Sequence, residues 1–401
     1  MKNELTTTHK SNYVDSILIW FITLCSLKFY TLFVPETFGK AIILFGVLLV
    51  PGLLIVHFVY GKSISSRKHF IIEIILIFTA FFVSTIAARY FHSQSIMTTI
   101  FAQYEFYVFL FYFLIHRMKP DPDKLLTMFI WLGYIYAIIY IVQYLLYPTQ
   151  IVNSKILADR NTVRIMMPGA GYMITAWFIL LSRYFRTKQI INIIGLIPFV
   201  LVIILLGTRQ IMATTALLTL LNILMSRTIK SKIFTYALIA LAIVPFYFLF
   251  QGVFDQIIAV SHKESSSIQN NIRFLAARYF LFDLNDNPLW ILTGNGMPGP
   301  HSDYGRFLYR ISDQLGYFQS DVGIIGDFSK FGILFALAEI VFLIKMALCK
   351  CREKYSFIRY NALMILMSMF TGAGLGAAMI VQICFMLYIT DTEKHYYSNH
   401  K

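Results

Sequence analysis

Charged residues and cysteines are both scarce in this sequence, and each shortage excludes a class of protein. Only 13% of the 401 residues are Asp, Glu, Lys or Arg, whereas 58% are hydrophobic. Because this is too little polar surface to cover a soluble globule, the sequence predicts an integral membrane protein. No disulfide framework or zinc site is indicated, since every cysteine lies in an apolar run or at the end of one. The four are Cys25, Cys349, Cys351 and Cys384.

Motifs for cofactor and metal chemistry are also missing. Gly294-Asn295-Gly296 is not a dinucleotide fingerprint, because the strand, helix and later acidic residue are absent. No cluster of metal-ligand residues is present, so we expect no cofactor and a metal-independent activity. The mostly polar first thirteen residues lead directly into a full-length apolar run, which argues against a cleaved signal peptide.

Long apolar runs dominate what is present. Each has about the length that a helix needs to cross roughly 30 Å of hydrocarbon. A chain in lipid must satisfy its own backbone hydrogen bonds, and the runs do not alternate like barrel strands, so we predict an all-α fold. The runs fall near residues 14–34, 39–60, 70–88, 98–116, 125–147, 164–182, 189–206, 210–225, 233–251 and 321–344.

The C-terminal apolar stretch, residues 357–390, is too long for one ordinary span, and a glycine-rich segment at 372–376 stands where a hairpin would turn. We therefore expect a polytopic bundle of 11–12 transmembrane helices with one large polar loop. Three regions follow. Residues 1–251 would form an N-terminal bundle of nine helices, residues 252–320 a partly helical loop, and residues 321–401 the C-terminal helices with a short tail.

Lysine and arginine predict the orientation, because cytoplasmic loops carry an excess of both. With the N-terminus inside, the inner segments hold nineteen such residues and the short outer loops hold six. The N-terminus is therefore expected in the cytoplasm and the loop 252–320 outside. This loop has five basic and six acidic residues. The formal net charge of +14 thus reflects orientation and attraction to anionic membrane lipids, not nucleic-acid binding.

Helical spacing divides the arginines of the long loop into two couples. Arg306 and Arg310 would each meet an aspartate three residues away on one helical face, which favours a structural role. No acidic residue lies within four positions of Arg273 or Arg278. These two could bind an anion, or they could reach lipid phosphates from an amphipathic helix at the membrane surface.

Arginines also stand at two expected outer helix ends. Arg209 follows Gly207-Thr208 and opens a helix. A cation there opposes the helix dipole unless an anion is also bound, which favours function over anchoring. Arg160 and Arg164 lie four residues apart at the entrance of the sixth span. On one helical face they would repel each other without a counter-ion, although Asp159 could relieve them.

One histidine and one aspartate complete the outer candidates. His301 follows a glycine- and proline-rich segment that can be neither helix nor strand for long. A rigid loop that presents an imidazole suits acid–base chemistry, although a lone surface histidine usually has no such role. Asp321 begins the run 321–344 and is either a helix N-cap or an active-site carboxylate, with Ser320 competing for the cap.

Charges within the spans are expected inside the bundle, since lipid does not solvate them. Lys28 and Glu105 are the deepest of these charges and could pair with each other. Glu73 lies beside the inner basic cluster, and Glu339 is close to Lys345 along the chain, so both glutamates favour a structural interpretation.

These landmarks, in this order, resemble those of Wzy-type oligosaccharide repeat-unit polymerases and, more loosely, of the O-antigen ligase superfamily. The pattern covers the whole topology. The segments that carry it are Gly207-Thr208-Arg209, Asn271-Ile272-Arg273 with Arg278, Leu292-Thr293-Gly294-Asn295-Gly296, His301, Ser320-Asp321-Val322-Gly323-Ile324-Ile325-Gly326 and Lys330-Phe331-Gly332-Ile333-Leu334.

The resemblance implies a fold similar to the GT-C-like lipid-linked glycosyltransferases, in the bacterial cytoplasmic membrane with the active site facing outward. The implied reaction transfers a growing glycan from undecaprenyl diphosphate to the non-reducing end of a lipid-linked repeat unit, as in O-antigen or capsule biosynthesis. The implied partners are that lipid-linked oligosaccharide and membrane lipids. A flippase and a chain-length regulator are protein partners to consider.

Roles for the candidate residues follow from this chemistry. Charge develops on the diphosphate leaving group, and preorganised arginines would stabilise it; we assign this role to Arg164, Arg209, Arg273 and Arg278. His301 is the first choice and Asp321 the second for the base that activates the acceptor hydroxyl. Substrate contacts are expected from Arg160, Trp290 and Tyr304, and other loop aromatics, including Tyr309 and Tyr317, could also stack on sugars.

Two alternatives stay open. An O-antigen-type ligase would share the donor chemistry and differ in acceptor, but Ser312 stands where the ligase pattern places a glycine. A polysaccharide flippase or transporter would use Lys28 and Glu105 as pathway charges. Such transporters are expected to show paired halves and short loops, and the single long loop argues against this.

Overall fold

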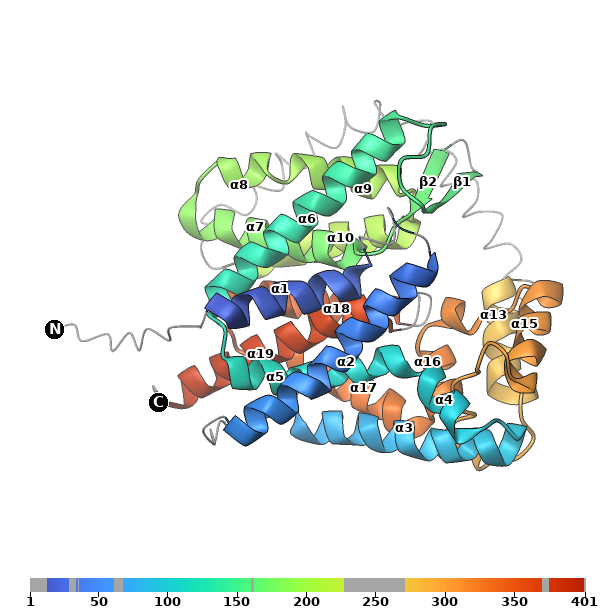
Figure 1. The fold of residues 1–401 in the computed structure, drawn as a ribbon. Coiled ribbons are helices and arrows are strands. Elements are labelled where there is room, and N and C mark those ends of the chain that lie inside the picture. The colour runs from blue at the N-terminus through green and yellow to red at the C-terminus, as the bar shows by residue number, and fades with distance from the viewer. Residues whose placement is uncertain are drawn as a thin grey trace.

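The computed structural model describes residues 13–28, 34, 36–60, 68–159, 162–226, 271–369 and 375–399. Within them the chain is mostly helical, as predicted, with one short two-stranded sheet (Figure 1). The predicted span 233–251, loop residues 252–270 and Arg160 lie outside the described residues.

The first half of the chain contains α1 (Tyr13–Leu27), α2 (Glu36–Tyr60), α3 (Ile71–His92), α4 (Ile96–Ala102), the 3-10 helix η2 (Tyr104–Leu110), α5 (Phe111–Met118), α6 (Pro122–Leu145), β1 (Lys155–Asp159), β2 (Thr162–Met166), α7 (Ala170–Thr187), α8 (Ile191–Ile194), α9 (Ile197–Leu205) and α10 (Arg209–Met225). The second half contains α13 (Ile272–Arg278), the π-helix η4 (Tyr279–Asp283), α14 (Trp290–Thr293), α15 (Asp303–Leu315), the 3-10 helix η5 (Gln319–Val322), α16 (Ile324–Phe331), α17 (Ile333–Ala347), η6 (Glu353–Tyr355), α18 (Phe357–Ser368) and α19 (Ala377–Asn399).

Three of these helices are long and apolar enough to cross a membrane: Thr37–Val59 within α2, Ile71–His92 and Pro122–Leu145. A fourth candidate is the pair formed by Ile96–Ala102 and Tyr104–Met118, whose two parts are bent by 66°. Length and composition thus support the prediction of membrane association for these segments.

That bend departs from the straight helix expected at 98–116. Gln103 sits at the break between α4 and η2 and is buried. Its Nε2 donates hydrogen bonds to Thr85 Oγ1 at 3.0 Å and to Tyr107 Oη at 2.8 Å. Its buried Oε1 has no hydrogen-bond partner among the described residues. This polar side chain within an apolar run marks the bend, and a hydropathy pattern does not register it.

The apolar run 321–344 is also divided. Residues 319–322 form η5, α16 ends at Phe331, and α17 starts after Gly332, whose φ is 77°. The N-cap residue of α16 is Gly323, without a side-chain cap. The prediction that Asp321 or Ser320 caps this helix is therefore wrong.

A β-hairpin replaces the first turns of the helix predicted at 164–182. β1 pairs antiparallel with β2, with Leu157 opposite Arg164, and α7 begins at Ala170. Tyr140 of α6 fixes the hairpin: its hydroxyl donates to Leu205 O at 3.3 Å and accepts from Ile165 N at 3.4 Å. Because Arg164 lies on a strand, the expected helical repulsion with Arg160 does not apply.

The C-terminal stretch forms two helices, α18 and α19, which is one of the two arrangements expected for it. Residues 380–391 of α19 are all buried, and the helix runs through the middle of the bundle in Figure 1. It packs against α1, α5 and η2. The last helix of the sequence is therefore a central element of the core.

The predicted ion pair between Lys28 and Glu105 is confirmed, with 2.9 Å between Nζ and Oε1. Lys345 pairs with Glu73 of α3, and within the described residues it forms no ion pair with Glu339, its acidic neighbour along the chain. Glu339 is 3% exposed and lies near the buried pair Asp327–Lys330. Proximity along the chain therefore did not identify the ion-pair partner of Lys345.

The two ends of the bundle differ. In Figure 1 the start of α1 and the end of α19 lie on one side, whereas the β-hairpin, α13 and α15 lie on the opposite side. The described part of the long loop and the hairpin thus gather at the same end of the molecule.

Candidate functional site

The described part of the long loop folds into a small helical unit, residues 271–322, which we call the helical cap. Two helix starts are capped locally: Asn271 Oδ1 accepts from Arg273 N at 3.0 Å, and Ser302 Oγ accepts from Gly305 N at 2.9 Å. Both interactions satisfy first-turn donors. A separate apolar cluster fills its interior, formed by Ala276, Phe280, Tyr304, Leu308 and Val322.

Gln94, between α3 and α4, fastens the helical cap to the bundle. Its Nε2 donates to Met297 O at 2.8 Å, and its Oε1 accepts from Gly299 N at 2.9 Å and from Ser302 Oγ at 2.6 Å. The side chain is 3% exposed. Because every polar atom of a buried amide is used here, the Met297–Ser302 loop has a defined position.

Two of the glycine-containing segments behind the family resemblance pack against each other. Asn295 N donates to Ser329 O at 2.9 Å, and Gly296 N donates to Lys330 O at 2.8 Å. A Cβ at Gly294 would overlap Lys330 O, and one at Gly332 would overlap Leu292 O. These glycines therefore serve close backbone packing, which requires residues without a side chain.

An open groove of about 690 Å³ runs along α15. Pro298 and Pro300 line one part of it, and the segment from Tyr317 to Ser320 lines another. Its polar lining includes Asp303, Arg306, Arg310, Tyr309, Tyr317, Gln319 and Ser320. The groove thus combines cations, hydroxyls and aromatic rings, the groups with which proteins bind anionic sugars and phosphates.

The two predicted catalytic residues are neighbours of this lining along the chain. His301 is exposed and follows Pro300, and Asp321 is exposed and follows Ser320. Ser320 Oγ donates to Asp321 Oδ1 at 3.2 Å. The fold therefore brings the two segments that carry the candidate bases to the same groove, although neither base itself belongs to the lining.

The arginines that line the groove are those that helical spacing assigned to structure. Arg306 pairs with Asp303 at 2.6 Å, but the side chains are 65% and 93% exposed. An ion pair this exposed is worth little and leaves the guanidinium available. Within the described residues Arg310 forms no ion pair with Asp313. Helical spacing thus predicted the ion pair between Arg306 and Asp303 correctly. It did not predict that Arg306 and Arg310 line a groove.

The predicted diphosphate-binding arginines lie elsewhere. Arg273 and Arg278 are exposed on α13, outside the groove lining. Arg164 on β2 and Arg209 at the start of α10 are half-buried at the hairpin corner, where Tyr140 joins β2 to the end of α9. Arg273 and Arg278 thus lie on α13, and Arg164 and Arg209 lie at the β-hairpin. None of the four lines the groove.

Two of the four aromatic residues named for sugar stacking, Trp290 and Tyr304, are buried. Tyr304 is 3% exposed and stacks on His92, with ring centroids 3.7 Å apart. Burial also raises the pKa of the Tyr304 phenol. Trp290 is 6% exposed and meets Phe328 edge to face. Neither ring offers an open face to a sugar in this conformation.

The other two aromatic residues named for stacking, Tyr309 and Tyr317, fit this role better by position. Tyr309 is 71% exposed and lines the groove together with Tyr317. An aromatic count along the loop does not distinguish rings that pack inward from rings that face a groove. A signal in the sequence was available, because Tyr309 immediately precedes Arg310 on the polar face of an amphipathic helix.

No protein-family model matches this sequence, and no curated protein is significantly similar to it.

Proposed function

We propose that the protein is a polysaccharide repeat-unit polymerase of the cytoplasmic membrane of a bacterium, with its active site on the outer face. The substrate is an oligosaccharide on undecaprenyl diphosphate. The growing glycan moves from its lipid diphosphate to the non-reducing end of one new lipid-linked repeat. On this proposal the chain is a polytopic membrane protein and a glycosyltransferase.

The observation that carries the proposal is the groove along α15. It joins two exposed arginines, Arg306 and Arg310, to the tyrosines Tyr309 and Tyr317. It also lies next to both segments that end in a candidate base. Around this one open surface, arginines would bind the diphosphate leaving group and tyrosines would stack on a sugar ring. A base would accept the proton of the acceptor hydroxyl.

The reaction requires one bond to form and one to break. The acceptor hydroxyl oxygen attacks the anomeric carbon of the donor and its proton passes to a base, for which His301 is the first choice and Asp321 the second. The bond between the anomeric carbon and the diphosphate oxygen breaks. Undecaprenyl diphosphate leaves with the bond electrons, and guanidinium groups stabilise its charge.

The pairing of Lys28 with Glu105 favours this proposal over a transporter. The two charges lie 2.9 Å apart and are each about a quarter to a third exposed. They neutralise each other, so their presence in apolar segments needs no transport pathway. A ligase shares the proposed donor chemistry and differs in its acceptor, so the products of the reaction distinguish the two.

We expect purified protein in proteoliposomes to convert undecaprenyl-diphosphate-linked repeat units into a ladder of glycans that differ by one repeat. One undecaprenyl diphosphate should be released for each bond formed. Gel separation of the glycans and mass spectrometry of the lipid give both readouts. A flippase would release no lipid diphosphate, and a ligase would form no ladder from repeat units alone; either result would refute the polymerase.

The proposed orientation is tested by cysteine labelling in intact cells. Asp313 is exposed on α15, whereas Lys350 is exposed between α17 and η6. We expect Asp313→Cys to react with a membrane-impermeant thiol reagent in intact cells, above the background of the wild-type protein. Lys350→Cys should react only after lysis. The opposite pattern would place the groove inside the cell.

A further inference from the structure

A second cavity, of about 390 Å³, lies between the start of α6, the end of α7 and η6, at the end of the bundle opposite the helical cap (Figure 1). Its lining includes three cations, Arg183, Arg186 and Lys354, and one acidic residue, Asp123. Two apolar residues, Leu126 and Ile179, complete one wall. No part of the proposed polymerase reaction uses this cavity.

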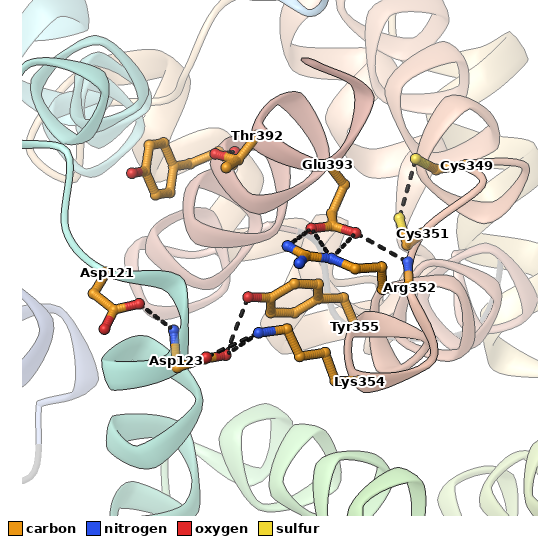
Figure 2. Close-up of polar contacts among 10 residues, drawn as sticks. Asp121, Asp123, Cys349, Cys351, Arg352, Lys354, Tyr355, Thr392 and Glu393 are labelled. Atoms are coloured by element: carbon orange, nitrogen blue, oxygen red, sulfur yellow. Dashed lines mark hydrogen bonds and ion pairs between the residues drawn. The ribbon is translucent and has the colours of Figure 1, made fainter. Parts of the chain in front are cut away.

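Asp123 is already neutralised inside the cavity. Lys354 Nζ donates to both carboxylate oxygens of Asp123 at 2.8 Å, and Tyr355 Oη donates to Oδ1 at 3.1 Å (Figure 2). Within the described residues, Arg183 and Arg186 form no ion pair. The cavity therefore keeps two arginine charges that no carboxylate of the described chain balances.

These two arginines are three residues apart on α7, so they share one face of the helix. Like charges at this spacing repel each other weakly, and an anion between them would remove that repulsion. The planar guanidinium fork matches the oxygens of a phosphate better than a lysine ammonium does. The arrangement therefore favours a phosphate over a simple monovalent anion.

Lys354 belongs to η6, and an ion pair with α19 holds η6 in place. Arg352 donates to the fully buried carboxylate of Glu393 on α19, with Nη2 to Oε1 at 2.5 Å and Nε to both oxygens at 3.0 and 3.1 Å (Figure 2). A bidentate contact of this kind holds η6 against α19. The cavity is thus bounded by residues with defined positions, which lowers the entropy cost of binding.

The position of the cavity favours a lipid as the source of the phosphate. Asp123 and Leu126 belong to the first turns of α6, one of the three candidate membrane spans. Lipid headgroups lie at such helix ends, and basic pockets between helices bind anionic headgroups there. Leu126 and Ile179 make this wall of the cavity apolar, although both side chains are largely buried in the core.

We propose that Arg183 and Arg186 bind a phosphate group in this cavity, carried by an anionic phospholipid or by a small soluble phosphate compound. The lipid source agrees with the helix-end position and the apolar wall. The site is independent of the polymerase proposal, since it lies at the other end of the bundle.

The test uses thermal unfolding of the detergent-purified full chain with phosphatidylglycerol, phosphatidylcholine or inorganic phosphate. We expect phosphatidylglycerol to raise the melting temperature of the wild type at a lower concentration than phosphatidylcholine does. Arg183→Gln with Arg186→Gln should increase the half-saturating phosphatidylglycerol concentration about tenfold or more. Lys188→Gln removes one positive charge, as Arg186→Gln alone does, from an exposed residue outside the lining and should match the wild type.

The other outcomes are equally decisive. A response to inorganic phosphate that the arginine substitutions abolish, without a preference for phosphatidylglycerol, would support the site and assign it to a soluble phosphate. Equal responses of wild type and double variant to both ligands would overturn the proposal. If the double variant does not fold, Arg186→Gln alone gives the same comparison, because this side chain is exposed.

Discussion

Removing both groove arginines, by Arg306→Gln with Arg310→Gln, should lower polymer formation by about 10²-fold, the low end of the loss expected for a preorganised charge donor. The low end applies because both side chains are exposed and water screens their charge. The loss should appear in kcat, since the diphosphate charge develops in the transition state. Initial rates of undecaprenyl diphosphate release in proteoliposomes measure it.

A matched pair decides which arginines hold the diphosphate. Arg273→Gln with Arg278→Gln removes the same charge from the same helical cap, at exposed positions outside the groove lining. We expect this variant to retain at least a third of the wild-type rate. If it loses activity and the groove variant does not, the earlier assignment of Arg273 and Arg278 is supported and the groove proposal fails.

This comparison matters because sequence spacing and structure favour different arginines. The interval of three residues between Asp303 and Arg306 correctly predicted an ion pair, and Ser302 caps a regular helix beneath it. Spacing alone, however, cannot reveal how exposed a pair is. Nor can it reveal that the proline-containing loop before α15 and the segment after it fold back to form a groove around that helix.

Hydropathy was more informative about the fold than about the site. Long apolar runs predicted helices correctly near most of the described ranges, and the two helices of the C-terminal stretch were among the expected arrangements. The breaks were missed at Gln103 and Gly332, because each depends on contacts with residues far along the chain. The burial of Trp290 and Tyr304 was missed for the same reason.

Gly332→Val should cause the largest loss of stability of any substitution considered. The φ of 77° is unfavourable for a β-branched residue, and the new side chain would overlap the backbone of Leu292. Backbone strain of about 1–3 kcal/mol and overpacking of about 1–3 kcal/mol together predict a destabilisation of roughly 2–6 kcal/mol. Chemical denaturation of the protein in detergent, followed by tryptophan fluorescence, measures it.

A second glycine provides the control. A Cβ at Gly376, immediately before α19, meets no atom of the described residues within 4 Å. Gly376→Ala should therefore change the free energy of unfolding by less than about 1 kcal/mol. Equal effects at both positions would show that close packing between residues 292–296 and 329–332 does not support the helical cap.

That packing has a consequence for the order in which the chain assembles. The bond between Asn295 Nδ2 and Ser329 O spans 34 residues, whereas the bond between Gln94 Nε2 and Met297 O spans 203. Short loops close at a lower entropy cost than long ones. The helical cap and the α16–α17 break can therefore form as one local unit late in synthesis. The helical cap then docks onto Gln94 and the helices that were synthesised before it.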